Sequence, residues 1–279
     1  MQKSIFYISE SLKSYYPETE ISAFSRLIIC FATGISFSDF LANRDKALTE
    51  EEEQKIVCIV DRLKTYEPIQ YILGETEFYG LPFFVNRDTL IPRPETEELV
   101  ELIINENKER EVSILDIGTG SGCIAVTLAK YLEKASVSAW DFSQGALDVA
   151  KQNAENNNVD VNFAKVDVLT DFPSSAKYDV IVSNPPYVLE SEKKDMLANV
   201  LDYEPHSALF VPDNRALLFY DRIADIALNI LNTGGLLYFE INQAKGKETI
   251  EMLEEKGFAD IMLLQDISKR DRMVRATLK

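Results

Sequence analysis

The chain has 279 residues, of which 46% are hydrophobic and 27% are charged. This composition excludes collagen, a coiled coil and a disordered linker, and it is typical of a globular protein with one long domain or with a small and a larger one. The formal net charge is -17, from 46 acidic and 29 basic residues. The electrostatic field of the whole molecule therefore opposes sequence-independent binding to a nucleic-acid phosphate backbone.

The sequence predicts a cytoplasmic protein. Its longest apolar run, residues 27–32, is far shorter than the roughly 20 residues that cross a bilayer. The N-terminal residues offer no apolar stretch long enough for a secretory signal. Cys30, Cys58 and Cys123 are widely spaced in apolar surroundings, which fits buried thiols in a reducing compartment better than disulfides or a metal site. We therefore expect no membrane span and no bound metal.

Residues 1–73 are predicted to form a small helical domain. Apolar residues recur there at three- and four-residue spacing, which is the period of an amphipathic helix. Pro17 ends the first helix, and Thr49 with Glu52 forms a capping-box pattern at the start of another. From residue 74 to residue 90 the pattern changes to aromatic residues between turn formers, which predicts a hairpin connector.

Residues 91–279 are predicted to form an α/β domain. After Pro94 the chain alternates short β-branched runs with helical patterns, which is the signature of right-handed βαβ units and a mainly parallel, twisted sheet. The expected strands are residues 112–117, 137–141, 161–166, 178–183 and 236–241. Helices are expected to begin at Ser121, Ser143 and Asn214. Residues 261–264 and 273–278 are expected to close the sheet as an antiparallel hairpin.

The first candidate site is a glycine-rich turn between the strand at 112–117 and the next helix. Asp116 precedes the turn, and its residues are Gly118, Thr119, Gly120, Ser121 and Gly122. Glycines let the backbone turn sharply and approach a ligand closely. The acid and the spacing resemble the first motif of the class I S-adenosylmethionine methyltransferases more than a dinucleotide-binding motif. Asp141 ends the following strand, where its carboxylate can accept both hydroxyls of a ribose.

The second candidate site directly follows the strand at 178–183. Its residues are Asn184, Pro185, Pro186 and Tyr187. The prolines fix the backbone and lack N–H donors, so carbonyl acceptors are held outward. The Asn amide adds an acceptor, and the Tyr ring adds a face for a planar group. Such a site suits an NH2 group attached to a planar carbon. The acceptors would align the nitrogen so that its lone pair faces a methyl donor. The structural alternatives are a tight turn for the glycine motif and a stiff loop for this one.

Together with the run LIPRPETE at residues 90–97, these motifs resemble the HemK-type protein-(glutamine-N5) methyltransferases, which modify peptide chain release factors. Shorter matching stretches lie at residues 68–74, 203–205, 208–209 and 270–272. At the level of motifs the likeness runs from about residue 66 to the end. The resemblance implies a class I methyltransferase-like fold for residues 91–279.

The resemblance also implies roles for the cofactor site. Residues 118–122 would line the methionine and ribose of S-adenosylmethionine, and Asp141 would hold the ribose hydroxyls. Asp167 and Val168, at the end of the strand at 161–166, would flank the adenine, although family members often have a large aromatic where Val168 stands.

Asn184 and Pro185 are the implied catalytic residues, because the Asn side chain and the Pro carbonyl would hold the substrate amide. Pro186 and Tyr187 would complete the substrate site, and Asn184 would also border the cofactor. At residues 240–245 the sequence departs from the family pattern, and we assign that stretch no role.

The function implied is methyl transfer from S-adenosylmethionine to the N5 atom of a glutamine in a release factor, with S-adenosylhomocysteine as the product. Residues 1–73 are then expected to dock the protein substrate, although a purely structural bundle fits nearly as well. Three alternatives stay open: a glutamine methyltransferase for a ribosomal protein, an adenine-N6 nucleic-acid methyltransferase, and a non-catalytic nucleoside-binding scaffold. The acidic balance argues against stable nucleic-acid binding.

Overall fold

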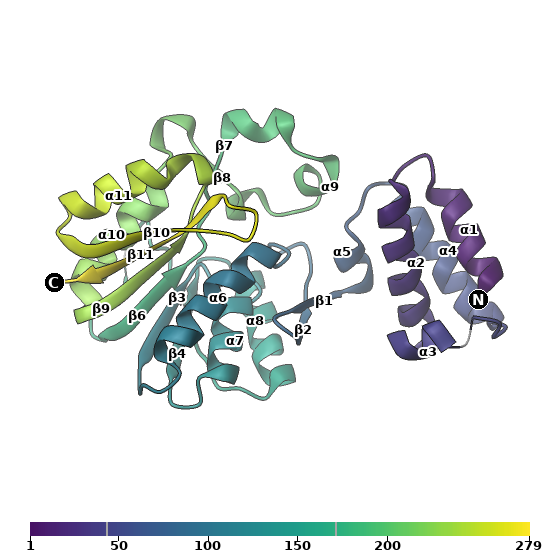
Figure 1. The fold of residues 1–279 in the computed structure, drawn as a ribbon, viewed down its shortest axis with the longest axis horizontal. Helices are drawn as coiled ribbons and strands as arrows, with labels where there is room; N and C mark the ends of the chain where they lie inside the picture. Colours follow the sequence, from purple (N-terminus) through teal and green to yellow (C-terminus); the bar gives the residue numbers. More distant parts are fainter. Residues whose placement is uncertain (43, 171) are drawn as a thin grey trace. The chain divides into compact units, whose positions relative to one another are not determined.

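The computed structural model describes residues 1–42, 44–170 and 172–279, which fall into two compact units (Figure 1). The first unit contains Met1–Gly74 together with the segment Leu197–Tyr203. The second contains Glu75–Met196 and Glu204–Lys279. The chain therefore leaves the second unit once and returns to it.

The first unit is helical, as predicted. Its helices are α1 (Gln2–Leu12), α2 (Glu18–Thr33), α3 (Phe37–Ala42), α4 (Glu50–Leu63) and α5 (Ile69–Leu73), with the short α9 (Ala198–Leu201) from the later segment. The apolar faces of α1, α2 and α4 meet in one core that includes Leu12, Ile28 and Val60. The capping box at α4 is present: Glu52 N donates to Thr49 Oγ1 over 3.2 Å, and Thr49 N donates to Glu52 Oε2 over 2.7 Å.

The second unit is built on a seven-stranded sheet with the order β10-β11-β9-β6-β3-β4-β5. Its strands are β3 (Ser113–Ile117), β4 (Ser136–Asp141), β5 (Asn162–Lys165), β6 (Tyr178–Ser183), β9 (Leu231–Glu240), β10 (Phe258–Gln265) and β11 (Asp271–Leu278). Strands β3, β4, β5, β6 and β9 run parallel, and β11 is antiparallel to both β9 and β10. This is the class I methyltransferase-like fold that the sequence predicted.

Helices cover both faces of this sheet (Figure 1). One face packs against α10 (Leu218–Ile230) and α11 (Gly246–Glu255), and its core includes Leu115, Tyr220 and Leu253. The other face packs against α6 (Pro94–Asn107), α7 (Cys123–Tyr131) and α8 (Gln144–Asn157), and its core includes Ile114 and Leu99. Ile114 and Leu115 serve opposite cores because successive side chains of a strand point to opposite faces.

The predicted hairpin is present, as β1 (Glu75–Phe78) paired antiparallel with β2 (Leu81–Phe84). It groups with the second unit and shares the core of α6 and α7 through Phe78 and Phe83. Two side chains of α8 bind its backbone. Asn153 accepts from Phe84 N over 2.7 Å and donates to Phe84 O over 2.9 Å, and Asn157 donates to Pro82 O over 2.9 Å. The hairpin is thus a structural part of the α/β unit.

Several boundaries differ from the expected ones. Strand β9 begins at Leu231 rather than at residue 236, because the ladder with β6 continues through an irregularity beside Gly234, whose φ is 76°. Asp213–Arg215 forms a 3-10 turn, so α10 begins at Leu218 instead of Asn214. Strands β7 (Val188–Leu189) and β8 (Phe210–Val211) pair in parallel and were not predicted. Further 3-10 turns are Glu190–Asp195, His206–Ala208 and Gln243–Lys245.

No helix among the described residues is both long and apolar enough to cross a membrane.

Candidate active site

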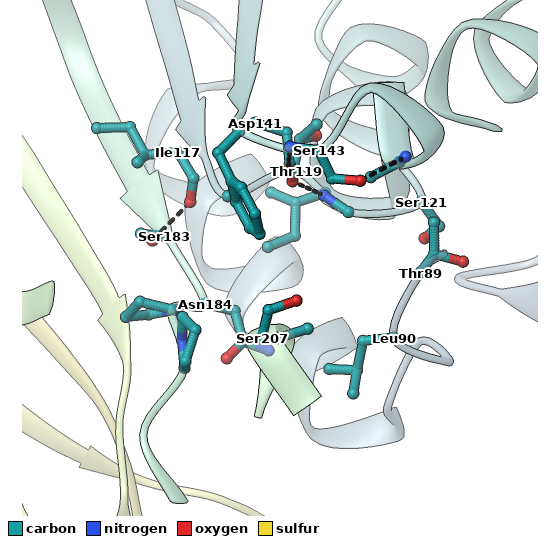
Figure 2. Close-up of a pocket in the computed structure, with 18 of the residues that line it drawn as sticks. Thr89, Leu90, Ile117, Thr119, Ser121, Asp141, Ser143, Ser183, Asn184 and Ser207 are labelled. Atoms are coloured by element: carbon teal, nitrogen blue, oxygen red, sulfur yellow. Dashed lines mark hydrogen bonds between the residues drawn. The ribbon is translucent and has the colours of Figure 1, made fainter. Parts of the chain in front are cut away.

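A pocket opens in the second unit at the carboxyl ends of the parallel strands, where ligands bind in open α/β sheets. Its walls come from the segments that follow β3, β4, β5 and β6, together with residues 88–93 and 205–208. In Figure 2, Asp141, Ser143 and Thr119 lie at one end of the pocket, and Asn184 and Ser207 lie at the other. The two predicted motifs therefore meet at one site.

The glycine turn after β3 has the backbone that its sequence predicts. Gly118, Gly120 and Gly122 have φ values of 76°, 55° and 80°, a region that side chains with a Cβ avoid. The turn is fixed to β4, because Gly118 N and Thr119 N both donate to Trp140 O, over 2.8 and 3.0 Å. A Cβ added at Gly118 or Gly120 would meet no atom within 4 Å, so the backbone there faces open space.

Gly122 serves packing instead of the pocket. It is the N-cap residue of α7 and does not line the cavity. A Cβ at this position would stand 3.0 Å from the Cβ of Ala150 on α8. The third glycine therefore lets α7 and α8 approach each other.

Asp116 lies beneath this turn and is fully buried. Thr119 Oγ1 donates to its Oδ2 over 2.6 Å. Burial, with a smaller contribution from the nearby Asp141 carboxylate, raises the pKa of Asp116 to about 7 against the lowering effect of the Thr119 hydrogen bond. The acid that precedes the glycine motif thus supports the turn from within the domain.

Asp141 ends β4, as predicted, and is 7% exposed. Its Oδ2 accepts from Gly120 N and its Oδ1 accepts from Ser143 N, each over 2.9 Å. Burial raises the pKa of the carboxyl, while these backbone hydrogen bonds lower it. Each oxygen can accept more than one hydrogen bond. The carboxylate is therefore held in place and keeps acceptor capacity for a ligand.

Asn184 follows β6 and lines the same pocket. Its Nδ2 donates to Thr96 Oγ1 over 3.2 Å, and Thr96 Oγ1 donates to Glu240 Oε2 over 2.6 Å. Tyr187 OH donates to Glu240 Oε1 over 3.2 Å. The Asn184 amide, at the carboxyl end of β6, is thus connected through Thr96 to the buried carboxylate of Glu240 at the end of β9.

The other residues of the second motif divide between the pocket and the core. Pro185 and Pro186 line the pocket, whereas Tyr187 does not. The Tyr187 ring packs against the core formed with α10 and α11, and burial together with the Glu240 charge raises the pKa of its hydroxyl. Tyr187 therefore anchors the loop to the core and to Glu240.

Asp167 and Val168 both line the pocket, but they lie in the turn beyond β5, whose last residue is Lys165. Asp167 is exposed, and its Oδ1 accepts from Leu169 N over 3.0 Å. Val168 is 9% exposed. Phe142, which directly follows the last residue of β4, also lines the pocket and is 51% exposed, so an aromatic ring is present beside Asp141.

The comparisons with known proteins follow the same division of the chain. Residues 95–209 match the Methyltransferase small domain family, and residues 7–74 match the PrmC N-terminal domain family. The release factor glutamine methyltransferase of Flavobacterium psychrophilum is 48% identical over 274 residues, which cover 97% of this chain and 96% of that protein. The one of Bacteroides thetaiotaomicron is 47% identical over 277 residues, 99% of each chain.

The chain belongs to the release factor glutamine methyltransferase family. A solved methyltransferase structure from Pyrococcus furiosus agrees with the fold, with a TM-score of 0.54 and 17% identity over 72% of this chain and 90% of that one. The methyltransferase fold and the family predicted from the sequence are therefore confirmed.

Sequence reasoning missed two residues that line the methyltransferase pocket, Thr96 and Phe142, and the buried Glu240 that accepts from Thr96. Thr96 lies within the proline-rich run, Glu240 lies in the stretch that departs from the family pattern, and Phe142 directly follows Asp141. The position of Phe142 next to a predicted strand-end acid was a usable signal. The pairing of Thr96 with Glu240 joins positions 144 residues apart, and no local pattern reveals it.

The pocket fits the methyl donor of such an enzyme. Open space in front of Gly118 and Gly120 lets a ligand lie against the backbone, and the fixed Asp141 carboxylate provides acceptors for ribose hydroxyls. The exposed Phe142 ring and the Val168 side chain offer apolar faces for a purine. Within the described part of the chain, no group of three or more His, Cys, Asp or Glu side chains could hold a metal ion.

Proposed function

We propose that this chain transfers a methyl group from S-adenosylmethionine to the N5 atom of a glutamine side chain in a peptide chain release factor. The observation that carries the proposal is the presence of Asn184 and Asp141 in one pocket, in a chain nearly half identical to enzymes of that name over almost its full length. The first residue offers an acceptor for an amide NH2, and the second offers acceptors for a ribose.

The residues assigned to the cofactor are Gly118 to Ser121, Asp141, Phe142, Asp167 and Val168, with Asn184 at the border between the cofactor and the substrate. S-adenosylmethionine, when bound, supplies an electrophilic methyl group on a sulfonium. The glycine turn and Asp141 would bind it and fix its position. Gly122, which was expected among these residues, acts indirectly by setting the position of α7.

The chemical problem for the protein is that an amide nitrogen is a poor nucleophile, because its lone pair is delocalised into the carbonyl. The Asn184 side chain and the Pro185 carbonyl would accept hydrogen bonds from the substrate NH2, orient the nitrogen and stabilise the positive charge that develops on it. Pro186 would hold this arrangement stiff. Orientation of this kind is worth about 7 to 11 kcal/mol in well-ordered systems. The proton can leave to water after transfer, so the mechanism requires no His or Lys base.

The first unit, including Met1–Gly74, is proposed to dock the release factor. Its match to the PrmC N-terminal domain family supports a role tied to this activity rather than a general helical scaffold. Because release factors act in translation, we place the reaction in the cytoplasm. We expect no stable complex with nucleic acid, since the net charge of -17 opposes it.

The function is tested by incubating the full chain with labelled S-adenosylmethionine and three substrates offered separately: a release factor, ribosomal protein and adenine-containing DNA. We expect label on the release factor alone, at a glutamine whose replacement by asparagine abolishes labelling. Label on DNA or on ribosomal protein with none on the release factor would overturn the proposal. No label on any substrate, with intact binding of S-adenosylhomocysteine, would favour a non-catalytic scaffold.

The same assay tests the role of Asn184. Asn184→Ala removes one preorganised acceptor, so single-turnover methyl transfer should slow by about two to three orders of magnitude. Affinity for S-adenosylhomocysteine, measured by calorimetry, should change little because the glycine turn and Asp141 remain. A near-normal single-turnover rate would contradict the proposed contact with the amide.

A further inference from the structure

Three residues from distant parts of the second unit form a hydrogen-bonded chain that ends at Asn184. Thr96 lies in the first turn of α6 and is 2% exposed, and Glu240 is the last residue of β9 and is 1% exposed. The distances are 3.2 Å from Asn184 Nδ2 to Thr96 Oγ1 and 2.6 Å from Thr96 Oγ1 to Glu240 Oε2. Water has little access to either Thr96 or Glu240.

The direction of these hydrogen bonds follows from the chemistry of the groups. Both oxygens of Glu240 receive a hydroxyl, one from Thr96 and one from Tyr187, which is the arrangement of an ionised carboxylate. Burial raises the pKa of Glu240, but the Thr96 hydrogen bond and the nearby Arg272 guanidinium oppose that shift. A carboxylate can only accept, so the single hydroxyl proton of Thr96 is committed to Glu240.

The consequence reaches the amide of Asn184. With its proton committed, Thr96 Oγ1 can only accept from Asn184, and the NH2 end of the amide must face it. In the reverse orientation the Asn184 amide oxygen would face Thr96 Oγ1, whose proton points toward Glu240. Two acceptors would then face each other without a hydrogen bond. The Asn184 oxygen is therefore the end of the amide left for a ligand in the pocket that Asn184 lines.

We propose that Thr96 and Glu240 are positioning residues that fix the orientation of the Asn184 amide. The inference rests on the proposed function, because it deepens the role of the same substrate site. An amide turned the other way would present its NH2 to the substrate NH2, and two donors cannot bond to each other. Glu240 thus sets which chemical group the pocket offers without touching the substrate.

The test uses Thr96→Val, which removes the hydroxyl at nearly constant volume, and Thr96→Ser, which restores it. Thr96→Val should slow single-turnover methyl transfer by about tenfold to a hundredfold, somewhat less than loss of Asn184 itself. Thr96→Ser should stay within about threefold of the wild type, and Glu240→Leu should behave like Thr96→Val because it has no acceptor for the hydroxyl proton. Affinity for S-adenosylhomocysteine should change little in all three.

A matched control is Thr249→Val on α11. Thr249 is fully buried, does not line the pocket, and donates to Lys245 O over 2.7 Å. The Thr249→Val variant should have a lower free energy of unfolding without a comparable loss in the single-turnover rate. Equal slowing in Thr249→Val and Thr96→Val would show that loss of a buried hydroxyl, not orientation of the amide, causes the effect.

A double-mutant cycle separates positioning from a merely structural role. In the Asn184→Ala background, Thr96→Val should have little further effect on the rate, because Thr96 acts through the amide that has been removed. If Thr96→Val slows the Asn184→Ala variant by the same factor as it slows the wild type, the two residues act independently and the proposal is overturned.

A second readout does not depend on activity. The side-chain NH2 of Asn184 should give a distinct, slowly exchanging pair of proton–nitrogen signals in the wild type and in Thr96→Ser, but not in Thr96→Val. An unchanged pair in Thr96→Val would overturn the positioning role even if the release factor is not the substrate. Conversely, an inactive wild type with the expected spectra would refute the proposed function and leave the orientation of the amide established.

Discussion

At the scale of single residues, Asp141 combines two properties that are usually opposed. It is nearly buried, which raises its pKa, and it must be ionised to accept two hydroxyls. Backbone donors from Gly120 and Ser143 make this possible, because they stabilise the charge and leave acceptor capacity on both oxygens. The cofactor site therefore depends on the protonation state of this one carboxyl.

Asp141→Ala should weaken the affinity for S-adenosylhomocysteine by about one to two orders of magnitude, because charge-assisted hydrogen bonds worth about 1.5 to 3 kcal/mol are lost. In the wild type the affinity should fall as the pH drops through the raised pKa of Asp141, because a neutral carboxyl must donate with one oxygen. The Ala variant should lack this dependence.

Calorimetry from about pH 8 to about pH 5 measures both effects. Asp116→Asn is the control, since Asp116 also has a raised pKa and lies nearby but does not line the pocket. It should keep the pH dependence. If the pH dependence disappears in Asp116→Asn and persists in Asp141→Ala, the titrating group is Asp116, and the role given to Asp141 is contradicted.

At the scale of elements, the sequence predicted what local patterns determine. The strands β3, β4 and β6 were found because they are β-branched runs followed by turn residues, and both site motifs were found because they follow these strands directly. Strands β7 and β8 were missed, since two-residue strands have no period to detect. The pairing of Thr96 with Glu240 was missed because it exists only once α6 and β9 are packed together.

The connection between α8, the hairpin and the glycine turn shows how elements support the site. Asn153 is fully buried, bonds both backbone groups of Phe84, and donates to Ser121 O over 2.8 Å. One side chain thus joins β2 to the turn that lines the pocket.

Asn153→Ala should lower the free energy of unfolding by about 2 to 4 kcal/mol, because it leaves buried backbone groups without partners at a cost of about 1 to 3 kcal/mol each. Denaturant unfolding measures this loss. Asn229→Ala is a matched control on α10: its exposed side chain donates to Asp225 O, one turn away, and its removal should cost less than about 0.5 kcal/mol. Equal, small losses at the two sites would contradict the supporting role of Asn153.

At the scale of the whole molecule, the boundary between the two units lies at residue 74, before the hairpin. Phe78 and Phe83 are at most 1% exposed within the core of the second unit. The segment Leu197–Tyr203 belongs to the first unit, where Tyr203 OH donates to Thr65 O over 2.9 Å. An isolated α/β fragment must therefore retain the hairpin.

A fragment of residues 75–279 should fold and bind S-adenosylhomocysteine, whereas one of residues 91–279 should be much less stable, since loss of a buried Phe costs about 3 to 5 kcal/mol. The longer fragment should lose activity on the release factor more than on a short glutamine peptide. Circular dichroism, calorimetry and the labelling assay measure these properties. Equal loss of activity on both substrates would show that the first unit supports the fold instead of docking the partner.

The position of β11 has a consequence for how the enzyme is made. This strand follows β10 along the chain but lies between β10 and β9 in the sheet, and β9 carries Glu240 at its end. Domains generally begin to fold from the N-terminal side during synthesis. While the ribosomal exit tunnel still covers Asp271–Leu278, β10 has no neighbouring strand in the sheet. The edge of β9 that later pairs with β11 is then unpaired. A nascent chain of this methyltransferase therefore completes its sheet only after its own translation has passed β11.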